Sequence, residues 1–340
     1  MRFAVDAMGG DYAPENIIEG VGLAVERYPQ VERFYLVGDE ARVKALVDHH
    51  QLPAERIEIV HASQVVEMRD SAALSVRRKR DSSVSVATEI VKRGDAQAII
   101  SAGHTGAAVA ATTVKLRLLK GVSRPGIASP LPNDHGICNI LDAGANTDAK
   151  ARHLLDYGIM GSVYSKHVLG VKDPKVGLMS VGEEDEKGTE FTKKVFGMLK
   201  DADVNFIGNV EGHDLFEKPI DIVVCDGFTG NVILKSCEAT AKAMFTWLKK
   251  ELKSTPIRYA GAMLAKGAFK AVKERSNYET YGGSPLLGVN GVVIIAHGSS
   301  SPLAICNAVR VAAEAVSHEL NPHIEEEIER YDKANAQDHE

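Results

Sequence analysis

Residues 96–106 read AQAIISAGHTG, and an alanine-rich stretch of helical character follows them. The paired Ile99 and Ile100 predict a buried strand, and the small and hydroxyl residues after them predict a turn into a helix. Glycine in such a turn lets backbone N–H groups approach an anion closely, and the start of the next helix adds partial positive charge. The stretch is therefore typical of a strand–loop–helix unit, either a plain tight turn or one wall of an anion site.

The same alternation of strand and helix runs along the whole chain. Nearly continuous apolar runs, typical of strands buried on both faces of a parallel sheet, predict strands at 2–7, 32–38, 56–62, 96–102, 138–145, 175–182, 204–209, 220–227 and 291–298. Amphipathic stretches predict helices at 15–28, 84–93, 150–168, 188–200, 231–253 and 302–318. This alternation predicts a doubly wound α/β sandwich with a mostly parallel sheet.

The distribution of these elements predicts a single domain over residues 1–323. Within it, residues 231–290 are expected to be an appended helical subregion, because no strand is predicted there. Residues 324–340 are rich in charge, and we expect a tail that begins as a helix and ends in solvent.

Composition narrows the functional classes. The 340 residues carry a net charge of −6, which gives no argument for nucleic-acid binding. The four cysteines lack metal-ligand spacing, and Cys225 ends an apolar run, so we expect reduced, buried thiols in a cytoplasmic protein. No window reaches the roughly 18 apolar residues of a membrane-spanning helix, and no signal-peptide core precedes the first strand. At most, the protein is expected to lie on a membrane surface.

Seven loops that follow predicted strands combine glycine with an acid, an amide, a hydroxyl or a lysine. They span residues 6–11, 101–106, 142–146, 181–188, 208–212, 226–231 and 297–300. Glycine in any one of them is typical of a turn. Because the carboxyl ends of parallel strands meet at one sheet edge, the seven together favour a cleft for an anionic ligand.

The motifs that are absent also narrow the chemistry. The chain contains no GxxxxGK[ST], no GxGxxG after the first strand and no GxSxG. A P-loop nucleotide hydrolase, a dinucleotide enzyme and a serine nucleophile elbow are therefore disfavoured. The pattern favours chemistry in which ligands are positioned and charge is stabilised without an enzyme nucleophile.

Two kinds of acidic feature leave alternatives open, a cluster of acids and three aspartates at strand ends. The acids of 183–186 could bind Mg²⁺, but four adjacent acids are more typical of a solvated loop, and no metal is expected. Asp6, Asp142 and Asp226 each end a predicted strand, where a cap or turn role is as plausible as a chemical one.

Two basic segments bear on partners. RRKR at 77–80 is either a solvated helix face or a docking site for an acidic partner. Residues 256–275 mix basic with apolar side chains, which favours a dimer contact first and contact with a membrane surface second.

Taken in order, the motifs resemble those of the bacterial phosphate acyltransferase family. DAMGGD (6–11), SAGHTGA (101–107), LDAGAN (141–146), GEEDEKG (182–188) and VCDGFTGNVILK (224–235) carry the resemblance, which extends from about residue 2 to 318. The family implies a three-layer α/β/α fold similar to phosphotransacetylase and the isocitrate/isopropylmalate dehydrogenase group. It also implies that acyl phosphate is made from acyl carrier protein thioester and inorganic phosphate for phospholipid synthesis.

The resemblance further implies partners and an environment. A homodimer is expected, with no cofactor and no metal requirement. Peripheral association with the inner face of the cell membrane is expected, beside a glycerol-3-phosphate acyltransferase that takes the product. Because acyl carrier proteins are acidic, Arg77, Arg78 and Arg80 become the expected docking residues for that partner.

The resemblance also implies roles for individual residues. It points to Lys187 and Asn231 as catalytic, with Lys187 binding phosphate or stabilising the oxyanion and Asn231 orienting one of the same oxygens. His104 stands where the family usually has asparagine, and its imidazole is expected to donate one hydrogen bond. The residues expected to bind phosphate or acyl phosphate are Asp6, Gly9, Gly10, Ser101, Gly103, His104, Thr105, Gly106, Asp142, Asn146, Asp226, Gly227, Gly230, His297 and Ser299.

Three other functions remain open on the sequence. A phosphotransacetylase would use acyl-coenzyme A in place of the carrier protein. A metal- and NAD-dependent decarboxylating dehydrogenase is possible on fold alone. A non-catalytic ligand-binding module is disfavoured by the number of polar loops.

Overall fold

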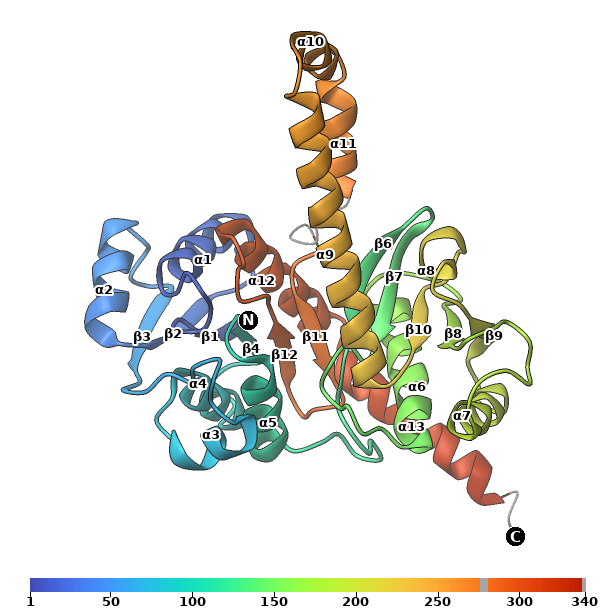
Figure 1. Ribbon diagram of the computed structural model, residues 1–340. Helices are drawn as coiled ribbons and strands as arrows, with labels where there is room; N and C mark the ends of the chain where they lie inside the picture. The colour runs from blue at the N-terminus through green and yellow to red at the C-terminus, as the bar shows by residue number, and fades with distance from the viewer. Residues whose placement is uncertain (276–280, 338–340) are drawn as a thin grey trace.

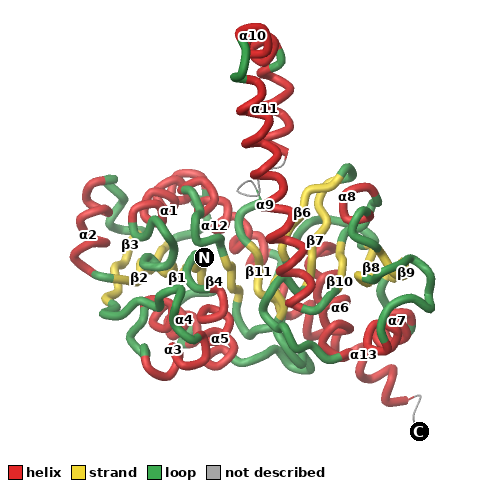
Figure 2. Tube along the Cα trace, in the orientation of Figure 1, coloured by secondary structure: helices red, strands yellow, loops and turns green. Residues whose placement is uncertain are grey.

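Two β-sheets lie side by side, and each is covered by helices on both faces (Figures 1 and 2). The computed structural model describes residues 1–275 and 281–337. The predicted α/β class with mostly parallel strands and three α/β/α layers is confirmed. The strands are divided between two sheets, however, where the sequence predicted one central sheet.

The first sheet has seven strands, of which five run parallel. In spatial order they are β3 (Ile57–His61), β2 (Arg33–Gly38), β1 (Arg2–Asp6), β4 (Ala98–Ser101), β12 (Val292–Ile295), β11 (Ser284–Leu287) and β5 (Gly126–Ile127). β11 pairs antiparallel with both β12 and β5. The central strands β1 and β4 are apolar and buried, as expected for strands that helices cover on both faces.

The second sheet has five strands, and four of them are parallel. Their order is β6 (Ser129–Asn133), β7 (Gly136–Leu141), β10 (Ile222–Val224), β8 (Lys175–Met179) and β9 (Asn205–Val210). β6 forms an antiparallel hairpin with β7 at one edge.

All nine predicted strands are confirmed, but three strands were not predicted. β5 has only two residues, while β6 and β11 contain proline, which breaks the apolar run that predicts a strand. The expectation that residues 231–290 lack a strand is therefore wrong, because β11 lies among them.

Helices cover the first sheet on both faces. One face packs against α1 (Glu15–Arg27), α2 (Glu40–His49) and α12 (Pro302–Ser317). The other face packs against α4 (Ser83–Lys92) and α5 (Thr105–Leu116), and α3 (Ala72–Arg78) lies against α5.

The second sheet is covered in the same way. α6 (Ala151–His167), α7 (Glu190–Lys200) and α13 (Leu320–Gln337) contribute to the core on one face. The opposite face packs against α8 (Asp214–Glu217) and the lower turns of α9 (Gly227–Leu252).

The C-terminal helix differs from the solvated tail that the sequence predicted. Ile324 and Ile328 on α13 are fully buried in the core beside α6. Arg152 on α6 pairs with Asp332 at 2.7 Å. The helix is thus an integral part of the core. Residues 338–340, the end of the predicted tail, lie outside the described residues.

An arm of three helices projects from the body (Figures 1 and 2). α9 leads away from the sheets, and α10 (Pro256–Leu264) and α11 (Lys266–Arg275) form its tip and its return. These three helices occupy 227–275 apart from short turns, so α9 begins four residues before the predicted subregion 231–290, and residues 276–280 lie outside the described residues. Within 1–275 and 281–337, no helix is long and apolar enough to cross a membrane.

Candidate active site

The seven glycine-bearing loops follow strands of both sheets. Loops 6–11, 101–106 and 297–300 follow β1, β4 and β12 of the first sheet. Loops 142–146, 181–188, 208–212 and 226–231 follow or end strands of the second sheet. The expectation of a single sheet edge is therefore corrected to two edges.

The structure brings five predicted residues of the first sheet around one small cavity. Asp6, Gly9, Ser101, Gly103 and His104 line it, and its volume of about 10 Å³ has room for no more than one water molecule. The cavity as it stands is too small for a phosphate ion.

Asp6 organises the loops around this cavity. The Ser101 hydroxyl donates to Asp6 Oδ2 at 2.7 Å and accepts from the Gly103 amide at 3.2 Å. Burial raises the pKa of the Asp6 carboxyl, and hydrogen bonds from Ser83 and Ser101 oppose that shift. Asp6 and Ser101 therefore shape the loop backbone and are shielded from a ligand.

Glycine is required where loops 6–11 and 101–106 meet. A Cβ at Gly9 would lie 2.6 Å from Asp6 Oδ2 and 2.7 Å from the Gly103 nitrogen. The neighbouring Gly10 has φ of +123°, and the next amide, of Asp11, donates to the Gly298 carbonyl at 2.7 Å. Loop 6–11 thus joins loop 101–106 to loop 297–300.

His104 caps helix α5. Its Nδ1 accepts from the Ala107 amide at 3.2 Å, so this nitrogen carries a lone pair. Asparagine, the residue that the family resemblance leads us to expect here, is also a favoured N-cap acceptor. The proton of the neutral His104 ring is then on Nε2, so the predicted hydrogen bond from His104 to a ligand stays a prediction for that nitrogen. Thr105 and Gly106 form the first turn of α5 and are half-buried.

In the second sheet, Asp142 has a structural role in place of the predicted ligand contact. Its side chain is fully buried, and its carboxylate accepts four backbone amides, those of Ile127, Gly144, Ala145 and Asn146, at 2.7–3.0 Å. Burial raises the pKa of the Asp142 carboxyl, and the four amide donors oppose that shift. Oδ1 accepts the amides of Ile127, Gly144 and Ala145, and Oδ2 accepts that of Asn146, so the buried carboxylate serves the loop backbone.

Asn146 and the start of α9 pack around this loop. The Asn146 side chain donates to His153 Nδ1 at 3.0 Å. Asp226 caps α9 by accepting from the Thr229 amide at 2.9 Å and hydroxyl at 2.7 Å. A Cβ at Gly230 would lie 2.0 Å from the Asp142 carbonyl oxygen, so glycine permits this close approach, as it does at Gly227. Asp226, Gly227 and Gly230 thus position α9 on the 142–146 loop.

Asn231 lies exposed beyond this packed turn. A Cβ at Gly144 would lie 3.7 Å from Asn231 Oδ1, so the amide is next to the 142–146 loop. Lys235 is one helical turn further along α9 on the same face, because residues four apart are neighbours on a helix.

Lys235 joins the two sheets and was missed by sequence reasoning. Its Nζ lies 3.2 Å from His297 Nε2, and His297 Nδ1 lies 2.8 Å from Ser299 Oγ. The predicted residues His297 and Ser299 therefore meet α9 of the second sheet. The signal that could have found Lys235 is its spacing of four from Asn231 within VCDGFTGNVILK.

Lys187 lies exposed on the loop between β8 and α7. Among residues 1–275 and 281–337, no side chain pairs with its ammonium group. The loop itself is fixed, because the Asn209 amide donates to the Glu184 carbonyl at 2.8 Å. The structure thus presents Lys187 at the same sheet edge as Asp226 and α9, without contact to them.

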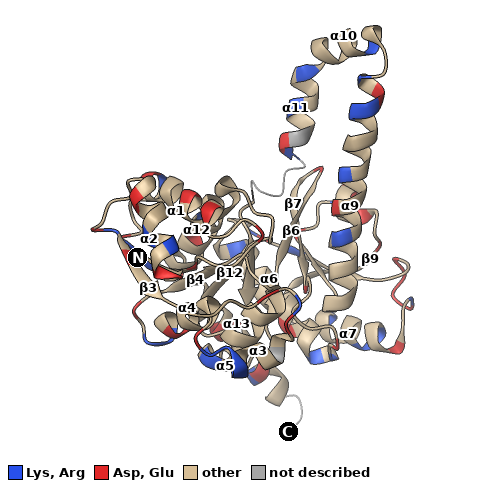
Figure 3. Cartoon of the chain, turned by 60° about the vertical axis from the view of Figure 1, so that its left-hand side comes forward, with Lys and Arg blue, Asp and Glu red and all other residues tan. Residues whose placement is uncertain are grey.

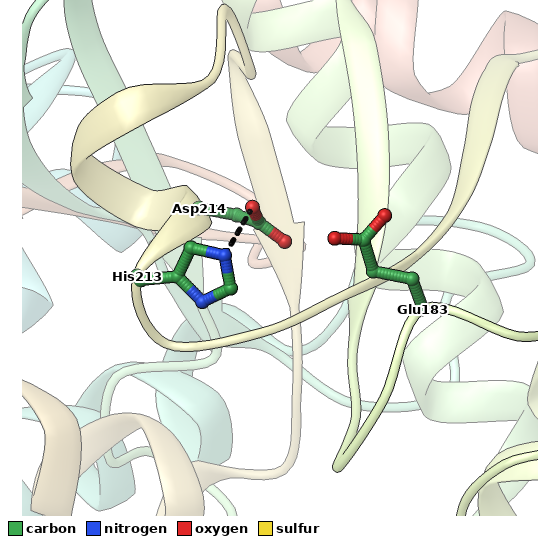
Figure 4. Close-up of side chains that lie close together, drawn as sticks. All are labelled: Glu183, His213 and Asp214. Atoms are coloured by element: carbon green, nitrogen blue, oxygen red, sulfur yellow. Dashed lines mark ion pairs between the residues drawn. The ribbon is translucent and has the colours of Figure 1, made fainter.

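Glu183, His213 and Asp214 gather beside this loop (Figure 4). The Lys218 ammonium lies 3.0 Å from Glu183 and 3.1 Å from Asp214, so a cation of the chain already sits between the carboxylates. Hydrogen bonds to Glu183 and Asp214 raise the pKa of Lys218. The cluster is an anchor for the lysine-bearing loop and gives no argument for a metal.

The predicted burial of Cys225 is confirmed. Burial raises the pKa of the Cys225 thiol, and it raises that of Cys138 to about 12. Neither thiol suits a nucleophile, in agreement with chemistry that uses none from the chain.

A family model and related sequences both match nearly the whole chain. A family model described as "Fatty acid synthesis protein" matches residues 1–322. A protein of Akkermansia muciniphila named "Phosphate acyltransferase" is 55% identical over 97% of this chain and 96% of its own length. One of Pelotomaculum thermopropionicum with the same name is 47% identical over 97% of this chain and 95% of its own.

Solved structures share the fold at low sequence identity. A phosphotransacetylase from Streptococcus pyogenes is similar with a TM-score of 0.60 at 15% identity, covering 93% of this chain and 94% of its own. The EutD phosphotransacetylase from Staphylococcus aureus gives 0.56 at 15% identity, covering 92% and 93%. The predicted likeness to the phosphotransacetylase fold is thus confirmed.

We predict a pH-dependent gain of stability for Asp6→Asn. Because burial raises the Asp6 pKa in the folded state above 3.8, its contribution to stability is present below pH 3.8 and is lost as pH rises through the folded-state pKa. Asparagine has no such loss. Urea unfolding at a series of pH values should show the variant gaining on the wild type, on the order of 1 kcal/mol, as pH rises from about 4. If the difference in unfolding free energy between Asp6→Asn and the wild type does not vary with pH, the pKa of Asp6 is not raised in the folded state.

Proposed function

The chain belongs to the phosphate acyltransferase family, and we propose that it makes acyl phosphate from acyl carrier protein thioester and inorganic phosphate for phospholipid synthesis. One observation carries the proposal. Lys235 of α9 contacts His297, which contacts Ser299, at the place where glycine-rich loops of the two sheets come together. Ammonium, hydroxyl and backbone N–H donors suit a phosphate ion, and no nucleophile of the chain is needed.

The reaction is a direct displacement. An oxygen of hydrogen phosphate bonds to the thioester carbonyl carbon, and the carbonyl oxygen transiently carries negative charge. The carbon–sulfur bond then breaks, and the proton of the hydrogen phosphate ends on the thiol of the carrier protein. The chain's part is to hold phosphate and thioester together and to stabilise the transient charge.

Lys187 and Asn231 are the proposed catalytic residues. An exposed ammonium on an anchored loop can stabilise the carbonyl oxygen or bind phosphate, and the Asn231 amide can orient an oxygen beside the 142–146 loop. The acidic residues next to Lys187 weaken its attraction for a free anion, which favours the role at the carbonyl oxygen.

The direct test is release of free thiol from acyl carrier protein thioester with and without inorganic phosphate. We expect phosphate-dependent release that falls roughly 10²-fold in Lys187→Ala, the usual effect of removing one well-aimed donor. Lys193→Ala, an exposed lysine of α7 that pairs with Glu190, is the matched control. Wild-type turnover in Lys187→Ala at saturating phosphate would remove this residue from catalysis.

The same assay with acyl-coenzyme A separates this function from phosphotransacetylase activity. Faster release from the coenzyme A thioester would favour that alternative.

We assign the docking of the carrier protein to α3 and the residues that follow it. Among the described residues, none pairs with the exposed Arg77, Arg78 or Arg80. Lys79 instead binds the Val65 carbonyl at 2.8 Å, and Val65 lines the cavity with His104. α3 packs against α5, and a Cβ at Gly106 would lie 3.1 Å from Ala72 Cβ, so α3 begins next to the 101–106 loop, where an acidic carrier would bring its thioester to the site.

We predict that Arg77→Gln with Arg78→Gln raises the apparent KM for acyl carrier protein several-fold, with a larger effect at low salt. The reason is that exposed charges attract an acidic partner most strongly when screening is weak. Arg33→Gln serves as control, because Arg33 begins β2 at the opposite sheet edge. An unchanged salt dependence would remove α3 from the docking surface.

The arm is the proposed contact with a second copy of the chain and with the inner membrane surface. Large apolar side chains stand exposed on it, among them Trp247 on α9, at 65%, and Ile257 and Leu264 on α10, at 85% and 92%. Lysines and arginines lie along the same helices (Figure 3). Basic and apolar groups together suit an anionic lipid surface, where a glycerol-3-phosphate acyltransferase would receive the acyl phosphate.

We predict that Met263→Glu with Leu264→Glu reduces sedimentation with anionic liposomes at least several-fold, because acidic groups replace exposed apolar ones at the tip of the arm. Analytical ultracentrifugation without lipid measures the dimer in the same variant. Equal liposome binding with a weakened dimer would assign the tip to the dimer contact alone.

A further inference from the structure

Lys235, His297 and Ser299 form a chain of hydrogen bonds that crosses from the second sheet to the first. Lys235 belongs to α9, whose lower turns lie between the two sheets (Figure 1), and His297 and Ser299 follow β12. Leu234, the residue before Lys235, packs against the cores of both sheets. The helix that carries the ammonium is therefore held at the junction.

The direction of the hydrogen bonds follows from their chemistry. An ammonium group only donates, so His297 Nε2 accepts from Lys235 Nζ at 3.2 Å. The ring proton of the neutral imidazole then lies on Nδ1, which donates to Ser299 Oγ at 2.8 Å. The alternative tautomer would accept from the Ser299 amide at 3.2 Å but would turn an N–H toward the ammonium, whereas the first tautomer turns its Nδ1 proton toward that amide and the Ser299 oxygen. The charge-assisted bond favours the first arrangement.

This arrangement leaves the Ser299 hydroxyl proton for a further acceptor. The serine oxygen already receives the ring proton, so its own O–H is the remaining donor of the chain. Each donor in the series Lys235, His297 and Ser299 is polarised by the one before it. The acceptor that suits the end of such a chain is an anion.

The loop around Ser299 is fixed, and charges of both signs lie near it, because a Cβ at Gly298 would lie 3.4 Å from Asp11 Oδ1. The Gly298 carbonyl accepts from the Asp11 amide at 2.7 Å, and the Ser300 carbonyl accepts from the Asn16 side chain at 3.0 Å. The 16-residue helix α12 begins directly after Ser301, its N-cap, and directs partial positive charge toward these serines.

One acid competes for the ammonium. Glu238 lies 2.9 Å from Lys235 Nζ, three residues along α9, and both side chains are substantially exposed. An exposed pair of this kind stabilises little, so an arriving dianion can share the ammonium.

We propose that Lys235 and Ser299 bind the inorganic phosphate at the junction of the sheets, with His297 as the positioning residue between them. The identity of the anion rests on the proposed function. In this assignment Lys235 holds the attacking phosphate, while Lys187 is left for the carbonyl oxygen.

The test measures initial rates of thiol release against phosphate concentration. Lys235→Met should raise the KM for phosphate roughly 10- to 100-fold, the usual effect of losing a hydrogen bond to a charged group, and should leave the KM for acyl carrier protein unchanged. Lys235→Arg should keep most of the phosphate affinity. Lys242→Met, an exposed lysine further along α9, is the matched control.

His297 is tested by rescue. His297→Gln retains an acceptor and a donor and should remain closer to the wild type in its KM for phosphate than His297→Ala. A double-mutant cycle of Lys235→Met with Ser299→Ala should cost less than the product of the two single effects, because both act on one anion. If the effects of the two substitutions on the KM for phosphate simply multiply, Lys235 and Ser299 do not act on one anion.

A second readout does not need turnover. Inorganic phosphate alone should raise the melting temperature of the wild type and of Lys242→Met, but not that of Lys235→Met. If the wild type releases no thiol while this shift is present, the proposed function fails and the anion site stands. If the wild type releases thiol and Lys235→Met has an unchanged KM for phosphate, the assignment of Lys235 is overturned.

Discussion

One buried carboxylate, Asp142, joins the two halves of the molecule. It ends β7 of the second sheet, yet it accepts the amide of Ile127 in β5 of the first sheet at 2.9 Å. The Ala143 amide returns a bond to the Ile127 carbonyl at 2.9 Å. A buried carboxylate is costly unless hydrogen bonds satisfy it, and four amides do so here. The relative position of the two sheets depends on this contact. The position of α9 depends on it too, because Gly230 of α9 packs against the Asp142 carbonyl.

The candidate site is a consequence of that junction. Because α9 packs on the 142–146 loop, the face of α9 that bears Asn231 and Lys235 lies toward loop 297–300 of the first sheet. The aspartates at the ends of β1, β7 and β10 shape loops and cap helices, so Lys235, Ser299 and Lys187 are left as donors for a ligand. An excess of donors over acceptors suits an anionic nucleophile that arrives from solution, as the proposed acyl transfer to phosphate requires.

The same helix, α9, continues into the arm, where its side chains are exposed instead of packed on the sheets. Only Gly227 and Gly230 of α9 are buried, and α10 buries no residue. Beyond the lower turns of α9, exposed apolar side chains such as Trp247, Ile257 and Leu264 gain nothing from the core of this chain, and burial against a second copy or a lipid surface is what would stabilise them. One helix thus links the site to the proposed membrane contact.

The sequence alone determined the α/β class, nine of the strands, the family and the glycine-rich loops, because each is encoded in local runs of residues or in ordered motifs. Tertiary structure alone decided that the strands form two sheets, that Ile324 and Ile328 belong to the core, and that Asp142 faces amides. It also decided that Lys235 meets His297, 62 residues away. Local pattern cannot supply these results, because contacts between distant segments depend on how helices and sheets pack, and packing is a property of the whole chain.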